Sequence, residues 1–169
     1  MKNIFLSILL LLSINLFGQQ NGTLLSNGTI VPKFNFEIEK GKTINISDYK
    51  GKVVLINFFA TWCGPCRMEL PLLQKEIWEK YQDNEHFALL IFGREEGWQK
   101  VIDFKTTNRF TFPMLPDEDK SIYKLFATQY IPRNVLLDED GKIVYQSIGF
   151  NADEFNKMKK IIDKLILKK

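Results

Sequence analysis

VVLINFFATWCGPC, residues 53–66, joins an almost uninterrupted apolar run to the only two cysteines of the chain. The run from Val53 to Ala60 is broken by Asn57 alone, and such a run suits a central strand that is covered on both faces. Apolar residues then recur at three- and four-residue spacing from Leu70 to Tyr81, which predicts an amphipathic helix. The cysteines are therefore expected where a buried strand gives way to a helix.

The remaining elements follow from the same kind of pattern. A second apolar run from Phe87 to Phe92 completes a strand, helix, strand unit, for which a right-handed parallel crossover is expected. Elsewhere the patterns predict a hairpin over residues 34–46, helices around residues 98–105, 122–126 and 155–165, and strands at residues 135–137 and 143–148. The expected fold class is α/β, a three-layer α/β/α sandwich with a mixed central sheet and an N-terminal β-hairpin.

Composition and charge limit the class of protein. The chain has 169 residues, of which 45% are hydrophobic and 25% are charged, as in an ordinary folded domain. A chain of this length buries enough surface for one core without covalent cross-links. The formal net charge of +3, from 23 Lys and Arg against 20 Asp and Glu, is small and dispersed. We therefore expect no nucleic-acid partner.

The first eighteen residues differ from the rest and predict a secretory signal peptide, residues 1–18. Their apolar run, residues 4–17, would span about 21 Å as a helix, which is short of the roughly 30 Å hydrocarbon layer. Leu16 is a poor match to the small residue expected before a cut near Gly18, so an uncleaved membrane tether is the alternative. We expect residues 19–33 to be a linker, residues 34–169 to form the domain, and the protein to be exported to the periplasm or another extracytoplasmic space.

The cysteine pair lies at the predicted start of a helix. Helix starts leave four backbone N–H groups unpaired and carry about half a positive charge, so a thiol there is stabilised as the thiolate. Pro65 suits a first helical turn, and Gly64 is expected to let the chain turn tightly and to keep a side chain away from the sulfur. We therefore expect Cys63 to be an exposed nucleophile, with the sulfur of Cys66 close behind it.

A zinc site and a purely structural disulfide are weaker interpretations of the cysteine pair. A structural zinc site takes four Cys or His ligands, whereas this chain has two cysteines and one histidine, His86. A purely structural disulfide would close a loop of four residues and contribute about 2 kcal/mol, which a chain with its own core does not need. We expect neither a metal ion nor a cofactor.

The motif WCGPC after an apolar strand resembles the thioredoxin superfamily, and the likeness extends from about Phe34 to the C-terminus. The segment Tyr130-Ile131-Pro132, followed by an apolar strand, is similar to the later part of that family, which contains a cis-proline. Residues 57–63 and 66–71 are most similar to the extracytoplasmic TlpA and ResA type of thiol-disulfide oxidoreductase. The resemblance implies a thioredoxin-like sandwich for residues 34–169 and a redox-active disulfide between Cys63 and Cys66.

The resemblance also implies which residues surround the cysteines. Asn57 stands where thioredoxin has a buried acid, so the proton acceptor must lie elsewhere. Glu69, three residues after Cys66, resembles the acidic residue beside the cysteines in the ResA type, and it would take the Cys66 proton. The alternative for Glu69 is an ordinary solvated charge in the first turns of the helix.

The predicted substrate-binding residues are Trp62, Gly64, Pro65, Ile131 and Pro132. Sequence alone predicts a trans bond before Pro132, because few X-Pro bonds are cis, but the resemblance implies a cis bond. A cis bond would place the backbone of Ile131 beside Cys63, as a strand edge for an extended substrate. Trp62 is expected to be partly exposed beside the sulfur, with a core position as the alternative. The stretch 94–96 is expected to be a solvated loop.

The expected function is an extracytoplasmic thiol-disulfide oxidoreductase that reduces disulfides of exported proteins, with apocytochrome c as a substrate that the family suggests. A membrane thiol-transfer protein would supply the electrons. Two alternatives remain open at this stage: a disulfide oxidase or isomerase that uses the same cysteines, and a non-catalytic thioredoxin-like module that binds peptides.

Overall fold

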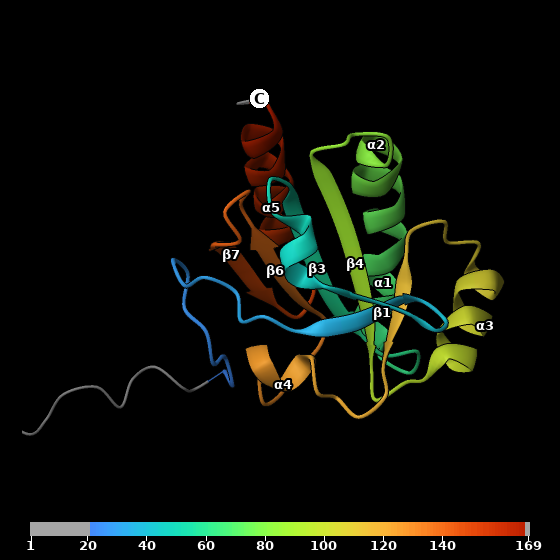
Figure 1. Ribbon diagram of the computed structural model, residues 1–169. Coiled ribbons are helices and arrows are strands. Elements are labelled where there is room, and N and C mark those ends of the chain that lie inside the picture. Colours follow the sequence, from blue (N-terminus) through green and yellow to red (C-terminus); the bar gives the residue numbers. More distant parts are fainter. Residues whose placement is uncertain (1–20, 168–169) are drawn as a thin grey trace, which may run out of the picture.

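The computed structural model describes residues 21–167 (Figure 1), so the predicted signal peptide lies outside the described residues. The strands are β1 (Asn35–Glu39), β2 (Lys42–Asn45), β3 (Val53–Phe59), β4 (Phe87–Arg94), β5 (Met114–Asp117), β6 (Arg133–Leu137) and β7 (Ile143–Ile148). The helices are η1 (Ile46–Tyr49), α1 (Gly64–Leu72), η2 (Leu73–Trp78), α2 (Glu79–Tyr81), α3 (Trp98–Asn108), α4 (Tyr123–Phe126) and α5 (Ala152–Ile166).

The central sheet has the strand order β5-β4-β3-β6-β7. Strands β3, β4 and β5 run parallel, whereas β6 and β7 are antiparallel to their neighbours. Every residue of β3 is buried, because the strand lies in the middle of the sheet and both of its faces are covered. The prediction of a mixed sheet with an N-terminal hairpin, formed by β1 and β2, is confirmed.

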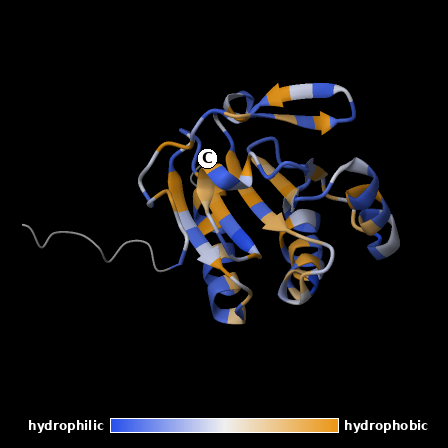
Figure 2. Cartoon of the chain, turned by 90° about the horizontal axis from the view of Figure 1, so that it is seen from below, coloured by the Kyte–Doolittle hydropathy of each residue, from blue (hydrophilic) through white to orange (hydrophobic). Residues whose placement is uncertain are grey.

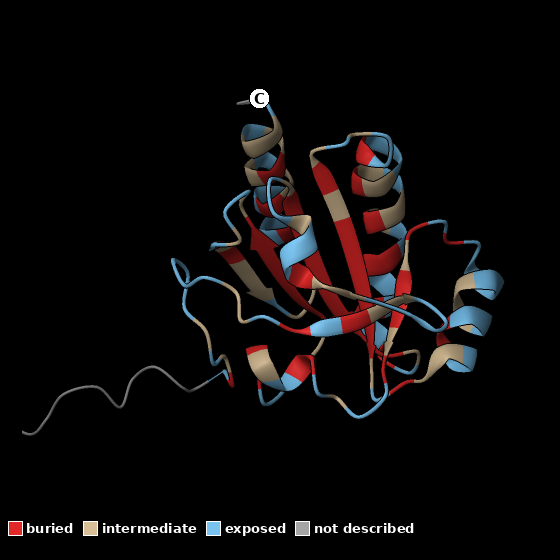
Figure 3. Ribbon diagram, viewed as in Figure 1, coloured by how far each residue is buried: buried red, intermediate tan, exposed pale blue. Residues whose placement is uncertain are grey.

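Two apolar clusters pack against the two faces of the sheet. The central strands between them are largely buried (Figure 3). One cluster packs side chains of α1, η2 and α5 against the sheet. The other cluster packs the β1–β2 hairpin, η1 and α4 against the opposite face, so a hairpin contributes to a layer for which helices were expected. The strands of the central sheet are largely hydrophobic, whereas the helices carry both kinds of residue (Figure 2). The three-layer arrangement is therefore confirmed.

Strand β5 and the helix over residues 70–81 differ from the sequence-based expectation. Strand β5 was not predicted: it has four residues, one of them Pro116, and it forms through parallel pairing with the end of β4. The helix predicted over residues 70–81 is continuous, but its α-helical part ends at Leu72, one residue after Pro71, and η2 is π-helical. Proline removes one backbone donor from a helix, which fits a change of hydrogen-bonding pattern next to it.

The predicted linker, residues 19–33, is described from Asn21 onward and runs along the domain. The Val31 N–H donates to the Gly141 carbonyl at 2.9 Å, and the Leu24 N–H donates to the Phe126 carbonyl at 2.8 Å. The buried guanidinium of Arg133 donates to Thr23 Oγ1 at 2.7 Å and to two backbone carbonyls. This segment is therefore attached to the start of β6, to the end of α4 and to the turn between β6 and β7. No helix within residues 21–167 has both the length and the hydropathy to span a bilayer.

Candidate active site

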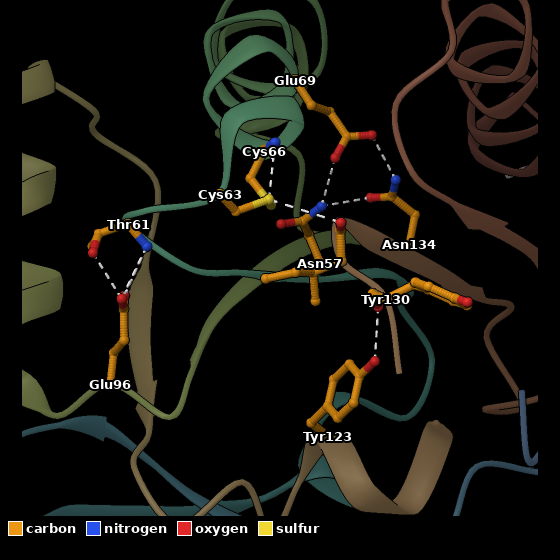
Figure 4. Close-up of a disulfide and its surroundings, with 10 residues drawn as sticks. Asn57, Thr61, Cys63, Cys66, Glu69, Glu96, Tyr123, Tyr130 and Asn134 are labelled. Atoms are coloured by element: carbon orange, nitrogen blue, oxygen red, sulfur yellow. Dashed lines mark hydrogen bonds between the residues drawn. A yellow bond between two sulfur atoms is a disulfide. The ribbon is translucent and has the colours of Figure 1, made fainter. Parts of the chain in front are cut away.

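The cysteine pair lies at the carboxyl end of β3, where three connections meet (Figure 4). These are the turn from β3 into α1, the turn that follows β4, and the segment that leads into β6. Strand β4 is parallel to β3, so it ends at this edge, and β6 is antiparallel, so it begins here. The topology thus brings residues from distant parts of the chain to the cysteines.

Cys63 and Cys66 form a disulfide with an S–S distance of 2.10 Å. Cys63 is the N-cap of α1, and its sulfur accepts the backbone N–H of Cys66 at 3.3 Å. Pro65 lies in the first turn, as predicted. The hydrogen bond from the Cys66 N–H and the positive end of the helix both favour negative charge on the Cys63 sulfur once the disulfide is opened.

The sulfur of Cys63 is less accessible than predicted. Cys63 is only 4% exposed and Cys66 is fully buried, and the Ile131 carbonyl oxygen lies 3.8 Å from the Cys63 sulfur. The steric argument for Gly64 is also wrong in part. Gly64 is helical, and an added Cβ would meet nothing within 4 Å, so the turn itself does not require glycine.

The segment that covers the disulfide contains the predicted cis bond between Ile131 and Pro132. The residue before it, Tyr130, has a φ of 69°, in the left-handed region that few non-glycine residues adopt. The Tyr130 carbonyl accepts a hydrogen bond from the Tyr123 hydroxyl at 2.7 Å, which ties this segment to α4. The edge beside Cys63 is thus held in place by a contact that sequence reasoning missed.

Glu69 is not a solvated charge, since it is only 2% exposed. Its Oε2 accepts from Asn57 Nδ2 at 3.0 Å, and its Oε1 accepts from Asn134 Nδ2 at 2.7 Å (Figure 4). The two amides also bond to each other, with Asn57 Nδ2 donating to Asn134 Oδ1 at 2.8 Å. Asn57 and Asn134 are partners in the antiparallel register of β3 and β6, so both amides reach the helix from the sheet.

Burial raises the pKa of Glu69 to about 7, although the hydrogen bonds from Asn134 and Asn57 act to lower it. A carboxyl with a pKa near neutrality can accept a proton and release it again at physiological pH. Glu69 is one helical turn after Cys66 on α1, which puts this proton acceptor near the buried sulfur. The group that could serve acid-base chemistry is thus the residue that the resemblance implies.

Trp62 is 65% exposed, so the alternative of a core position is wrong. The guanidinium of Arg94 lies 5.9 Å from the centre of the Trp62 ring.

The loop after β4 was predicted to be solvated, but Glu96 in this loop is only 1% exposed. Its carboxylate accepts from the Thr61 hydroxyl at 2.7 Å and from the Thr61 N–H, and it pairs with Lys100 at 2.9 Å. Glu96 therefore anchors the turn that carries the cysteines.

Three side chains around the site were missed by sequence reasoning: Asn134, Glu96 and Tyr123. Asn134 follows the cis-proline segment, and only the β3–β6 register reveals that it faces Asn57. Glu96 lies among charged residues, so its sequence context predicts a solvated loop. Only the folded chain places its carboxylate against Thr61. Within residues 21–167, no group of three or more potential metal-ligating side chains gathers in one place.

Comparison with known proteins extends these observations. The family model described as Redoxin matches residues 26–163. The chain is 32% identical over 127 residues to the thiol-disulfide oxidoreductase ResA of Bacillus thuringiensis (strain Al Hakam), covering 75% of this chain and 72% of the relative. It is 35% identical over 126 residues to the thioredoxin-like protein YneN of Bacillus subtilis (strain 168), covering 74% and 73%.

Two solved structures are similar over most of the chain. A proposed protein disulfide isomerase from Bacteroides thetaiotaomicron superimposes with a TM-score of 0.83 at 35% identity, covering 88% of this chain and 95% of that one. StoA from Bacillus subtilis superimposes with a TM-score of 0.61 at 28% identity, covering 78% and 98%. With the cysteine pair at the head of α1, these matches show that the chain belongs to the redoxin family and is a ResA-like thiol-disulfide oxidoreductase.

Proposed function

We propose that this protein works outside the cytoplasm and reduces disulfide bonds of exported proteins. The observation that carries the proposal is the buried Glu69 carboxyl one turn from the disulfide, with a pKa of about 7. Such a group favours repeated exchange at neutral pH over a purely structural bond. The leader-like sequence of residues 1–18 and the similarity to ResA support the extracytoplasmic location.

The reaction begins with the dithiol form. The Cys63 thiolate attacks one sulfur of the partner's disulfide, the partner's S–S bond breaks, and its second sulfur leaves as a thiolate that takes a proton. Cys66 then loses its proton to Glu69 and attacks Cys63. The mixed disulfide breaks, the partner's first sulfur leaves and is protonated, and the Cys63–Cys66 bond forms. Two electrons pass from the protein dithiol to the partner, which leaves as a dithiol.

The substrate would bind as an extended segment across the site. Trp62, the residue before Cys63, is exposed, and the backbone of Ile131 next to the cis-proline offers a strand edge. Gly64 and Pro65 are exposed at the head of α1, which leaves that side open to a partner. Exported disulfide-containing proteins are the proposed substrates, with apocytochrome c among them, and a membrane thiol-transfer protein is the proposed electron donor.

A second candidate function is disulfide isomerisation. It is favoured by the similarity to the proposed isomerase from Bacteroides thetaiotaomicron, whose structure superimposes with a TM-score of 0.83. An isomerase uses the same attack by Cys63, but the substrate's own thiol resolves the mixed disulfide. The two functions therefore differ in the need for Cys66.

The test uses protein expressed from residues 1–169 in a host that exports proteins. With dithiothreitol as electron source, the protein should accelerate insulin disulfide reduction, and Cys63→Ser should abolish the acceleration. Cys66→Ser should stop turnover and accumulate disulfide-linked adducts with exported proteins, whereas an isomerase would retain the ability to reshuffle scrambled ribonuclease. In intact cells, alkylation should find the wild-type cysteines mostly reduced. A pair found mostly oxidised would contradict the reductase, and the absence of any adduct would favour a non-catalytic binding module.

A further inference from the structure

One buried polar atom beside the disulfide has no hydrogen-bond partner among the described residues. Asn57 is 0% exposed, and its Oδ1 accepts no hydrogen bond from residues 21–167. A buried carbonyl oxygen without a hydrogen-bond partner destabilises the folded state, so such atoms are rare and call for a physical cause. The same amide group uses its nitrogen fully, with bonds to Glu69 and Asn134.

The orientation of the Asn57 amide is fixed by its neighbours. Nδ2 donates to Glu69 Oε2 and to Asn134 Oδ1, and Asn134 is itself held by its Nδ2, which donates to Glu69 Oε1 and to Ser147 Oγ. A flipped Asn57 amide would set its oxygen against two acceptor oxygens and lose both bonds. The oxygen must therefore occupy the other side of the carboxamide, which is directed toward the cysteine pair in Figure 4.

The position of Asn57 along β3 agrees with this view. Leu55 and Phe59, two positions before and after Asn57 on β3, belong to the apolar cluster that also contains Cys66 and Leu70. Side chains of a strand alternate between faces, so Asn57 shares this face and meets α1 beside Cys66. While the disulfide is closed, the Cys66 sulfur carries no hydrogen that it could donate.

We propose that Asn57 Oδ1 accepts a hydrogen bond from the Cys66 thiol in the reduced protein. Opening the disulfide takes two electrons and two protons from a dithiol donor, which becomes a disulfide, and one of the protons stays on Cys66. The new S–H group faces an acceptor that was unpaired before. The contact exists only in the dithiol form, so it stabilises that form over the disulfide and makes the pair easier to reduce.

The same contact separates the roles of the two cysteines. An acceptor oxygen favours the protonated thiol, so Asn57 keeps Cys66 neutral, whereas the helix terminus favours the Cys63 thiolate. Cys66 thus stays a thiol until the mixed disulfide has formed. The inference rests on the redox activity of the pair, and it is independent of the substrate, of the direction of electron flow and of the role of Glu69.

The decisive measurement is the redox equilibrium of the Cys63–Cys66 pair against dithiothreitol buffers. Asn57→Leu keeps the size of the side chain but removes the acceptor, and it should shift the equilibrium about tenfold toward the disulfide, which corresponds to a potential about 30 mV lower. Asn134→Leu is the matched control, because it removes an equally buried amide of the same network and leaves Asn57 Oδ1 in place. It should shift the equilibrium less than about threefold, since it removes no partner of a sulfur. Equal shifts in both variants, or no shift in Asn57→Leu, would overturn the proposal.

A spectroscopic test does not depend on the folding of either leucine variant. In Cys63→Ala the Cys66 thiol is the only S–H group of the protein. Its infrared S–H stretching band should lie at lower frequency than that of a free thiol, as expected for a hydrogen-bonded donor. A band at the free-thiol position would refute the contact. Failure of the insulin assay with a shifted S–H band would leave this inference intact and count only against the reductase.

Discussion

Asn57 and Phe58 are neighbours in β3, yet they face two different layers of the molecule. Phe58 is fully buried among aromatic rings, with the centres of the Tyr123 and Phe126 rings each 5.3 Å away. Asn57 is equally buried, but it faces α1 and bonds to Glu69. The face around Phe58 is therefore mainly apolar, with the buried Arg133 as its register partner on β6, whereas the face around Asn57 contains buried polar groups beside a disulfide.

The two layers differ in how their buried groups affect the free energy of unfolding. The layer around Phe58 gains from burial of aromatic surface, and the buried guanidinium of Arg133 on this face donates to Thr23 Oγ1 and to two backbone carbonyls. The layer around Asn57 contains the Glu69 carboxyl, whose ionised form is destabilised by burial. It also contains the Asn57 Oδ1 atom, which has no hydrogen-bond partner among the described residues. We expect mutations in the first layer to change stability alone and mutations in the second to change the redox chemistry.

The largest effect on stability is expected from Phe58→Ala. Removing a fully buried phenylalanine leaves a cavity and costs about 3–5 kcal/mol of the free energy of unfolding. Urea denaturation of the oxidised protein measures the loss, and the redox equilibrium of the folded fraction should stay that of the wild type. Should Phe58→Ala fail to fold, Phe58→Leu provides a milder version. A changed redox equilibrium in the folded variant would show that the two layers are not independent.

The next effect is the pH dependence of stability that Glu69 imposes. Its pKa is about 7 in the folded protein against 4.5 as the ordinary value, so the folded state binds more protons than the unfolded state between these pH values. Stability should therefore fall as the pH rises from 4.5 to 7, by up to about 3 kcal/mol, and then level off. Denaturation of the oxidised protein across this range measures it. Glu69→Gln should remove this part of the slope, and an identical slope in both proteins would contradict the assignment.

Glu69→Gln should also slow exchange by about a hundredfold at neutral pH, because the amide cannot take the Cys66 proton. The wild-type rate should rise as Glu69 ionises near pH 7, and the variant should lose this inflection. Stopped-flow measurement of the release of the mixed disulfide gives the profile. Glu79→Gln, which removes an exposed carboxylate further along the same helical segment, serves as the control for loss of charge. An unchanged profile in Glu69→Gln would remove Glu69 from the mechanism.

The smallest effect is expected from Trp62→Ala. Trp62 is 65% exposed, so its removal should change the free energy of unfolding by no more than about 0.5 kcal/mol. The KM for a protein disulfide should rise about fivefold, because an aromatic contact with the substrate is lost. Ile30→Ala offers a matched control, since Ile30 is 56% exposed and pairs with Lys142, away from the cysteines. A similar KM for both variants would argue against a substrate contact at Trp62.

The local sequence pattern was sufficient to predict the helices and strands that bury a regular set of apolar residues. The apolar run of β3 and the helical period of α5 are visible without any partner, because each strand or helix face is recorded in the spacing of its residues. Strand β5 was missed because four residues with a proline carry too little pattern. It becomes a strand only through pairing with β4.

The sequence by itself determined the strand, the helix and the cysteine pair at their junction, because these depend on neighbours within a few positions. Only the tertiary structure decided which polar groups meet there. Asn57 and Asn134 are 77 positions apart, and Thr61 and Glu96 are 35 positions apart. A buried polar group must find its partner through strand register and chain reversal, and no local pattern of hydrophobicity records that choice.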